Sequence, residues 1–244
     1  MISAWSFSKL VTYEKCPYGA KLQYVDRVPE PPRKPPPGKQ EHPLDRGIRI
    51  HEAAELFVRG GVELIPELKS FSDDFVKLQT LFNDGKVSLE DNWGVRRDWG
   101  ATAWASADLW GRAKLDAFVT NEDGLEATVI DYKTGRKDGN EVKHGEQGSV
   151  YVLAAHGRNS ELERINVEFW YTDQNEITHT AYRATAIPRM RAKWQRRINV
   201  MLNDTEFKPR PNVISCKWCP YRPESTGGGG NCPYGYSPVN RSQI

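Results

Sequence analysis

The stretch "ATVIDYKTG", Ala127 to Gly135, decides the fold. β-branched and aromatic residues dominate it, which predicts a buried β-strand. Asp131 and Lys133 then place a carboxylate and an ammonium at the end of that strand. Because alternate residues of a strand face the same side, both side chains point at one target. The stretch therefore predicts a strand that carries two charged groups to the edge of the core.

A second acidic residue is expected across from this pair. "GRAKLDAFV", residues 111–119, is typical of another strand, and "NEDG", residues 121–124, of a hairpin turn between the two. In such a hairpin Asp116 falls opposite Asp131 to within a residue or two of register. Two carboxylates this close repel unless a cation lies between them, which favours a hard-metal site for Mg²⁺ or Mn²⁺. The alternative is that Asp116 caps a turn and that Asp131 and Lys133 form a surface ion pair.

Helices and further strands are predicted on both sides of this hairpin. Helical patterns cover "SFSKLVTYEKCPYGAKLQYV" (6–25, where one helix should end near Cys16 and another should follow Pro17), "LDRGIRIHEAAELFVRGG" (44–61), "FSDDFVKLQTLFNDG" (71–85, with Ser72 as the expected cap), "HGEQGSVYVLAAHG" (144–157) and the segment from Pro188. Strands are expected in the region of Trp93, Trp99, Trp104 and Trp110, and at 165–172 and 177–185. This order predicts an α/β fold with a central mixed β-sheet flanked by helices.

Composition limits the classes of protein to which this chain can belong. With 244 residues and 38% hydrophobic residues, it can bury one sizeable core, so we expect a single domain over 1–244, with a proline-rich linker or excursion at 29–43. The formal charge is only +2, so nucleic acid would have to bind at local patches. No run approaches the roughly 18 apolar residues of a membrane span, and the start lacks the pattern of a signal peptide. We expect a cytoplasmic protein, in the host cytoplasm if a phage encodes it, with no membrane partner.

Several motifs, taken in order, resemble one nuclease family. These are "SFSKLVTYEKCP", "RGIRIHEAAE", "GRAKLDAFV", "VIDYKTG", "QGSVY" and the late cysteines. Together they resemble the PD-(D/E)xK nuclease superfamily, and most closely its RecB-like exonucleases, which include CRISPR-associated iron–sulfur exonucleases and many phage recombination nucleases. The resemblance covers most of the chain. It implies a restriction-endonuclease-like core and metal-dependent hydrolysis of phosphodiester bonds.

The resemblance also implies a set of metal ligands. His51 matches an additional metal ligand on a helix, and Asp116 and Asp131 match the two acidic ligands. Tyr132, which lies between Asp131 and the lysine, is included in the expected metal group. A divalent ion held there can polarise a phosphodiester and stabilise the charge that develops during in-line attack. Without the family, His51 would be interpreted as an ordinary structural histidine.

Three further residues are expected to act on the substrate. Lys133 matches the catalytic lysine, whose ammonium orients water or neutralises the phosphate. Gln147 and Tyr151 match a glutamine and a tyrosine that position DNA near the active site. Independently of the family, their spacing of four places both on one face of a helix.

Four cysteines predict a second metal centre. Cys16 lies near the start, and Cys216, Cys219 and Cys232 lie near the end. Reducing cytosol favours metal ligation over disulfides, and one centre would join 1–28 and 205–244 into a module. The resemblance implies a [4Fe–4S] cluster. The long gap "PYRPESTGGGGN" between the last two cysteines leaves a tetrahedral zinc site as an alternative, and unligated thiols as a third.

A basic helix completes the functional hypothesis. "PRMRAKWQRRINVM", residues 188–201, carries Arg189, Arg196 and Arg197 among apolar residues, and these arginines are candidates for phosphate contacts. The expected protein is a metal-dependent DNA exonuclease that acts on ends or single strands in recombination, repair or replication, as an oligomer or with a recombination partner. The alternatives are a structure-specific endonuclease, a non-catalytic nucleic-acid-binding scaffold with an iron–sulfur or zinc site, and a zinc-binding adaptor.

Overall fold

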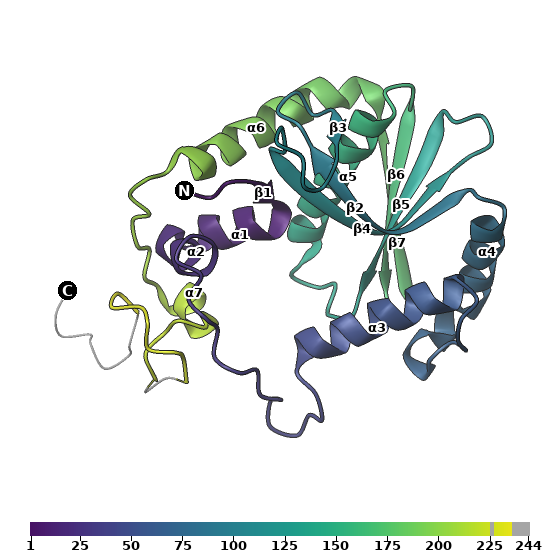
Figure 1. Cartoon of the computed structure of the whole chain (residues 1–244). Coiled ribbons are helices and arrows are strands. Elements are labelled where there is room, and N and C mark those ends of the chain that lie inside the picture. Colours follow the sequence, from purple (N-terminus) through teal and green to yellow (C-terminus); the bar gives the residue numbers. More distant parts are fainter. Residues whose placement is uncertain (225–226, 236–244) are drawn as a thin grey trace. The chain divides into compact units, whose positions relative to one another are not determined.

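The computed structural model describes residues 1–224 and 227–235 (Figure 1). The chain divides into two compact units: Lys34–Ala192, and a second unit that combines Met1–Arg33 with the chain from Lys193 onward. Of the predicted cysteine module, residues 225–226 and 236–244 lie outside the described residues. The first unit contains a β-sheet, and the second contains the four cysteines.

The sheet of Lys34–Ala192 is mixed. Its strands run in the order β3-β2-β4-β5-β6-β7. They are β2 (Val87–Val95), β3 (Ala101–Thr102), β4 (Gly111–Thr120), β5 (Glu126–Lys133), β6 (Arg164–Tyr171) and β7 (Glu176–Arg183). β5 and β6 are parallel, and the other neighbours along this order are antiparallel. The parallel pair needs a crossover connection, which the helix between β5 and β6 supplies.

Helices cover both faces of this sheet (Figure 1). On one face, α3 (Pro43–Val58), the short helix η1 (Pro66–Phe71) and α4 (Ser72–Asn83) pack against the even-numbered residues of β5, including Ile130 and Tyr132. On the other face lies α5 (Glu141–Arg158). Its Gly148 comes so close to β6 that an added Cβ would lie 3.0 Å from Val167 Cγ1. The predicted α/β fold with a central mixed sheet is confirmed.

The second unit is built mainly from helices. It contains β1 (Trp5–Ser6), α1 (Phe7–Lys15), α2 (Pro17–Tyr24), α7 (Val213–Lys217) and the end of α6 (Ile187–Asn203). The rings of Phe7 and Trp194 meet edge to face at 6.1 Å between centroids, and Tyr13 donates to Asp204 Oδ2 at 2.6 Å. Buried aromatic contacts between α1 and α6 therefore join segments from the two ends of the sequence.

Two details of the sequence-based prediction are wrong. Ser72 is the first residue of α4 rather than its cap; the cap position is Phe71, without a side-chain hydrogen bond. Trp99, Trp104 and Trp110 lie in connections beside β3 rather than in strands. Trp99 and Trp110 are buried and meet edge to face at 5.3 Å between centroids, so these residues fill the core from loops. Aromatic residues signal burial as readily as strand pairing.

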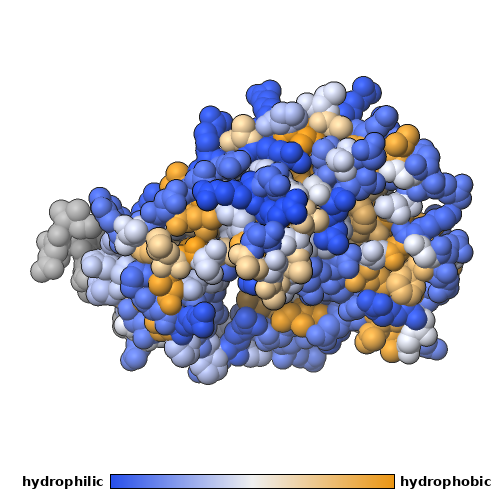
Figure 2. Space-filling model, turned by 45° about the horizontal axis from the view of Figure 1, so that its top comes forward, coloured by the Kyte–Doolittle hydropathy of each residue, from blue (hydrophilic) through white to orange (hydrophobic). Residues whose placement is uncertain are grey.

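Residues 29–42 form neither helix nor strand. Within 1–224 and 227–235, no helix combines the length and the apolar character that crossing a bilayer requires. Figure 2 shows hydrophilic side chains over most of the viewed face, with hydrophobic ones in separate spots.

Candidate metal centre and active site

The β4–β5 hairpin brings the two predicted aspartates together. Its ladder ends at the pair Ala117 and Ile130, and one further step of the same register sets Asp116 opposite Asp131. There the strands part, and Asp116 Oδ2 accepts the backbone N–H of Tyr132 at 2.7 Å. Both aspartates are buried, at 8% and 4% exposure. The predicted hairpin turn is confirmed by the bond from Gly124 N to Asn121 O and by the positive φ of Gly124, +72°.

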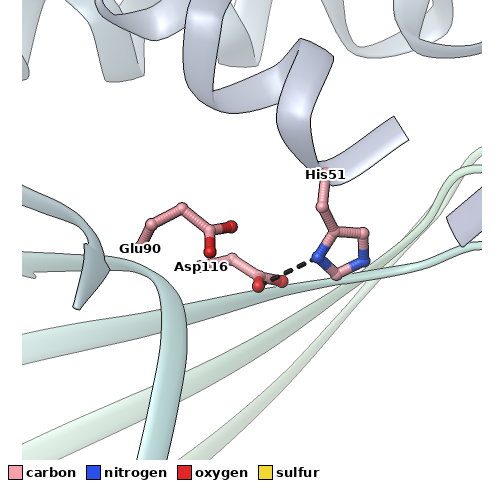
Figure 3. Close-up of side chains that lie close together, drawn as sticks. All are labelled: His51, Glu90 and Asp116. Atoms are coloured by element: carbon pink, nitrogen blue, oxygen red, sulfur yellow. Dashed lines mark hydrogen bonds and ion pairs between the residues drawn. The ribbon is translucent and has the colours of Figure 1, made fainter. Parts of the chain in front are cut away.

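Asp116 belongs to a group of three potential metal ligands (Figure 3). His51 comes from α3, Glu90 from β2 and Asp116 from β4, and one ligand atom of each lies within 4.8 Å of the others. His51 Nδ1 and Asp116 Oδ1 are hydrogen-bonded at 3.0 Å. Two carboxylates and an imidazole make a hard to borderline ligand set, which suits a divalent cation.

Sequence reasoning missed Glu90. Its backbone is left-handed, with φ at +51°, although it lies inside β2. The β2–β4 ladder skips it: Leu89 pairs with Ala117 and Asp91 with Leu115, so Glu90 is level with Asp116 without being paired. A left-handed non-glycine residue costs energy and is concentrated at functional sites. The sequence offered only an acidic residue inside a strand pattern, which is a weak signal.

Asp131 has a different set of neighbours, supplied by α5 and β5. Tyr151 donates its hydroxyl to Asp131 Oδ1 at 2.6 Å, and Gln147 donates to the same oxygen at 3.3 Å. Lys133 Nζ lies 2.5 Å from Asp131 Oδ2 and donates to Gln147 Oε1 at 2.8 Å. The structure therefore brings Asp131, Lys133, Gln147 and Tyr151 into one network. Asp131 is not a member of the group of three.

Burial and mutual repulsion govern the electrostatics of this site. Burial, followed by the charge of Asp131, raises the pKa of Asp116, and the hydrogen bond from His51 only partly offsets this. For His51, burial lowers the pKa, but the bond to Asp116 and the nearby carboxylates outweigh it and raise the pKa overall. Burial and Asp131 raise the pKa of Tyr151 well above its usual value, so its hydroxyl keeps its proton. A cation would relieve the repulsion between the carboxylates.

Tyr132 contributes its backbone rather than its side chain. Its ring packs among Phe75 and Trp170 in the core beneath α3 and α4, with centroids at 5.4 and 5.7 Å. Its hydroxyl is buried without a hydrogen-bond partner among the described residues. Its N–H, by contrast, holds Asp116.

The four cysteines gather within the second unit. All four are free and half-buried. Burial, and then the neighbouring thiols Cys232, Cys216 and Cys16, raise the pKa of the Cys219 thiol. Cys16 Sγ accepts the backbone N–H of Arg210 at 3.4 Å. A set of four neighbouring thiols has the chemistry of an iron–sulfur or zinc ligand set.

The three candidate arginines of the basic helix α6 differ in their surroundings. Arg197 donates from Nε and Nη2 to the two carboxylate oxygens of Glu14, at 2.8 and 2.7 Å, and lies 4.3 Å from the Trp194 ring centroid. Arg189 and Arg196 are exposed. Of the three predicted phosphate-binding arginines, Arg197 is therefore already paired with a carboxylate of the protein.

Comparisons with known proteins identify the family. A family model described as the PD-(D/E)XK nuclease superfamily matches residues 4–109 and 100–223, which include every residue of the metal group and of the Asp131 network. No curated protein matches the chain. Among solved structures, one titled "Crystal structure of SSO0001" is 15% identical, covers 96% of this chain and 88% of its own, and has a TM-score of 0.43. The family match spans most of the chain, and the chain belongs to the PD-(D/E)XK nuclease superfamily.

Proposed function

We propose that this protein is a metal-dependent DNA exonuclease that hydrolyses phosphodiester bonds at DNA ends or in single strands. Nucleases of its superfamily act on nucleic acid with divalent metals. The observation that carries the proposal is the pair of buried aspartates, level with each other where β4 and β5 part. Such a pair is costly in a protein that never binds a cation there.

His51, Glu90 and Asp116 would hold the cation, and Asp131, whose charge acts on Asp116, is the further proposed ligand. The carboxylate-rich set favours Mg²⁺ or Mn²⁺. When bound, the cation supplies Lewis-acid stabilisation of the charge that develops on the phosphate. The hydrogen bonds to His51 and to the Tyr132 N–H fix the orientation of the Asp116 carboxylate before any ligand arrives.

Lys133 provides a fixed positive charge beside the reacting phosphate. Its ammonium is anchored by Asp131 and Gln147, and it lies 5.3 Å from the Phe169 ring centroid. A charge that is oriented before the reaction does not have to reorganise during it, which makes it effective in a water-poor site. Lys133 thus neutralises the phosphate or orients the attacking water.

Gln147 and Tyr151 hold this arrangement in place. Gln147 donates to the Tyr151 hydroxyl at 2.5 Å, and Tyr151 in turn donates to Asp131. The tyrosine keeps its proton because of burial, so the direction of the bond is fixed. The two side chains therefore orient Asp131 and Lys133, and through these two residues they would position the DNA.

The test is cleavage of linear and circular DNA, single- and double-stranded, with Mg²⁺ or Mn²⁺ and with EDTA. An exonuclease releases nucleotides from linear substrates and spares closed circles. Cleavage of closed circles would favour the structure-specific endonuclease instead. If the wild-type protein binds DNA but cleaves no substrate with either metal, the non-catalytic scaffold replaces the enzyme. Asp116→Asn is the inactive control.

The cysteine group is proposed to hold a [4Fe–4S] cluster within a module of residues 1–28 and 205–244, with zinc as the alternative. The support is the proximity of the four thiols and their origin at both ends of the sequence. Anaerobic purification followed by iron, sulfide and zinc analysis decides between them. Iron and sulfide in equal amounts support the cluster, and zinc without iron contradicts it.

We propose that the exposed arginines of α6, Arg189 and Arg196, contact the phosphates of DNA. Arg196→Glu is expected to weaken DNA binding and to reduce its salt dependence, because phosphate contacts release counterions. Arg189→Glu makes the same test near the start of the helix. Arg197→Glu is not a clean probe, since it also breaks the ion pair with Glu14. Unchanged affinity and salt slope in both clean variants would remove the helix from the proposal.

A further inference from the structure

One face of β4 leads away from the metal group and carries basic side chains. Along Gly111–Asp116, buried residues alternate with Arg112 and Lys114, which point outward. Lys114 is 58% exposed, and its Nζ lies 2.5 Å from Glu90 Oε2. The charges of Asp116 and of Glu55 on α3 also act on it, so Lys114 lies beside the metal group.

An exposed tryptophan, Trp104, lies beside Arg112. Six of the eight tryptophans are buried, whereas Trp104 is 38% exposed. The guanidinium of Arg112 lies 4.9 Å from the Trp104 ring centroid and donates to the Trp104 carbonyl at 3.2 and 3.3 Å. The ring is therefore held in place by the neighbouring basic residue.

The loop that carries Trp104 is ordered before any ligand binds. Asp108 Oδ1 accepts the hydroxyls of Thr102 at 2.5 Å and Ser106 at 2.6 Å. Ser106 N also donates to Ala103 O at 3.1 Å. A preorganised aromatic surface loses little conformational entropy when a ligand stacks on it.

We propose that Lys114, Arg112 and Trp104 form a binding track for one strand of nucleic acid, with phosphates on the two basic side chains and an unpaired base on the Trp104 ring. The inference rests on the proposed function and names the substrate class of that site as single-stranded nucleic acid.

The spacing of the side chains supports this occupant. Residues two apart on a strand are about 7 Å apart, which is close to the step between neighbouring phosphates of an extended strand. The Lys114 side chain is 58% exposed while its partner Glu90 is 14% exposed, so a phosphate reaches the Lys114 ammonium from its solvent side. A tryptophan ring stacks on any unpaired base, whereas bases inside a duplex are already stacked.

The test is binding of a fluorescein-labelled oligo-dT and of a duplex of equal length, measured in EDTA so that no cleavage occurs. Trp104→Ala is expected to weaken oligo-dT binding roughly five- to hundredfold, the range for loss of one stacked base, and to leave duplex binding unchanged. Trp104→Phe keeps an aromatic face and should retain much of the affinity. Lys114→Gln should weaken oligo-dT binding and lower its salt slope by about 0.7. Lys77→Gln, an exposed lysine on α4, is the control.

The outcomes separate this inference from the proposed function. Trp104→Ala and Lys114→Gln proteins that bind oligo-dT as the wild type does, with the same salt slope, overturn the track, even if the wild type cleaves DNA. Wild-type protein that binds no oligo-dT also overturns it. If the wild-type protein shows no metal-dependent cleavage but binds oligo-dT in a way that depends on Trp104, the nuclease is refuted and the binding track is supported. Thermal melting by circular dichroism checks that each variant folds. If Trp104→Ala does not fold, the comparison uses Trp104→Phe and Lys114→Gln instead.

Discussion

The two groups of potential metal ligands are held in different ways. The carboxylate group comes from a helix and two strands, and hydrogen bonds within the protein already orient Asp116 and Asp131. The cysteines occupy the junction of α1 and α2, the five-residue helix α7 and two loop positions. Thiols are weak hydrogen-bonding groups. The first group is thus preorganised by the fold, whereas the second depends on its metal to hold chain segments together.

The largest expected effect is on catalysis within the preorganised group. Lys133→Met removes the fixed charge and should lower kcat about a hundred- to a thousandfold, the usual loss for one preorganised donor. Lys137→Met is the matched control, since that ammonium pairs with Glu176 instead. Single-turnover cleavage measures both. A kcat in Lys133→Met equal to that of the control would contradict the role of the lysine.

The next largest effect is expected at Glu90, which sequence reasoning missed, and it concerns the affinity for Mn²⁺. Glu90→Gln should weaken Mn²⁺ binding roughly tenfold to a hundredfold, the range seen when groups around a metal are removed. Its neighbour Asp91 accepts a hydrogen bond from Trp93 Nε1 at 3.1 Å, so Asp91→Asn tests the same strand without touching the metal group. Calorimetric titration compares the two. Equal Mn²⁺ affinity in both variants would exclude Glu90 as a ligand.

The cysteine group should respond through stability rather than through chemistry. Cys216→Ser is expected to lose the bound metal and about 3 kcal/mol of unfolding free energy, the amount that a ligand at a hundred times its Kd provides. Ser215→Ala, one residue earlier in α7, is the control. Metal analysis and denaturant unfolding measure the change. Full stability in a metal-free Cys216→Ser protein would show that the thiols are not structural ligands.

The smallest expected effect concerns a hydrogen bond in the same unit. Bonds from Tyr13 and from the backbone of Phe207 and Glu206 outweigh burial and lower the pKa of Asp204. A carboxylate with a lowered pKa stabilises the fold above its unfolded pKa, and this stability is lost as pH falls through the folded pKa. Asp204→Asn should therefore cost about 1 kcal/mol at neutral pH and less in acid. Urea unfolding at both pH values tests this, and a cost independent of pH would contradict it.

The sequence predicted the parts of the site that follow from strand periodicity. Alternation along β5 and the hairpin turn were sufficient to set Asp116 opposite Asp131, because register is a local property. The family resemblance, rather than periodicity, supplied His51, Gln147 and Tyr151. Glu90 could not be found in this way, since its role depends on one left-handed residue, and backbone strain leaves no mark in a strand pattern. Trp104 was interpreted as a strand residue because aromatic composition does not distinguish loops from strands.

The central claim is that Asp116, with its neighbours His51 and Glu90, binds a divalent cation. Titration of metal-free protein with Mn²⁺, followed by electron paramagnetic resonance, tests it directly, because thiolates are poor ligands for this hard ion. The account predicts saturable Mn²⁺ binding in the wild type and its loss in an Asp116→Asn protein that melts no lower than the wild type, since burial and repulsion disfavour the charged Asp116. Mn²⁺ binding of wild-type affinity in Asp116→Asn would contradict it.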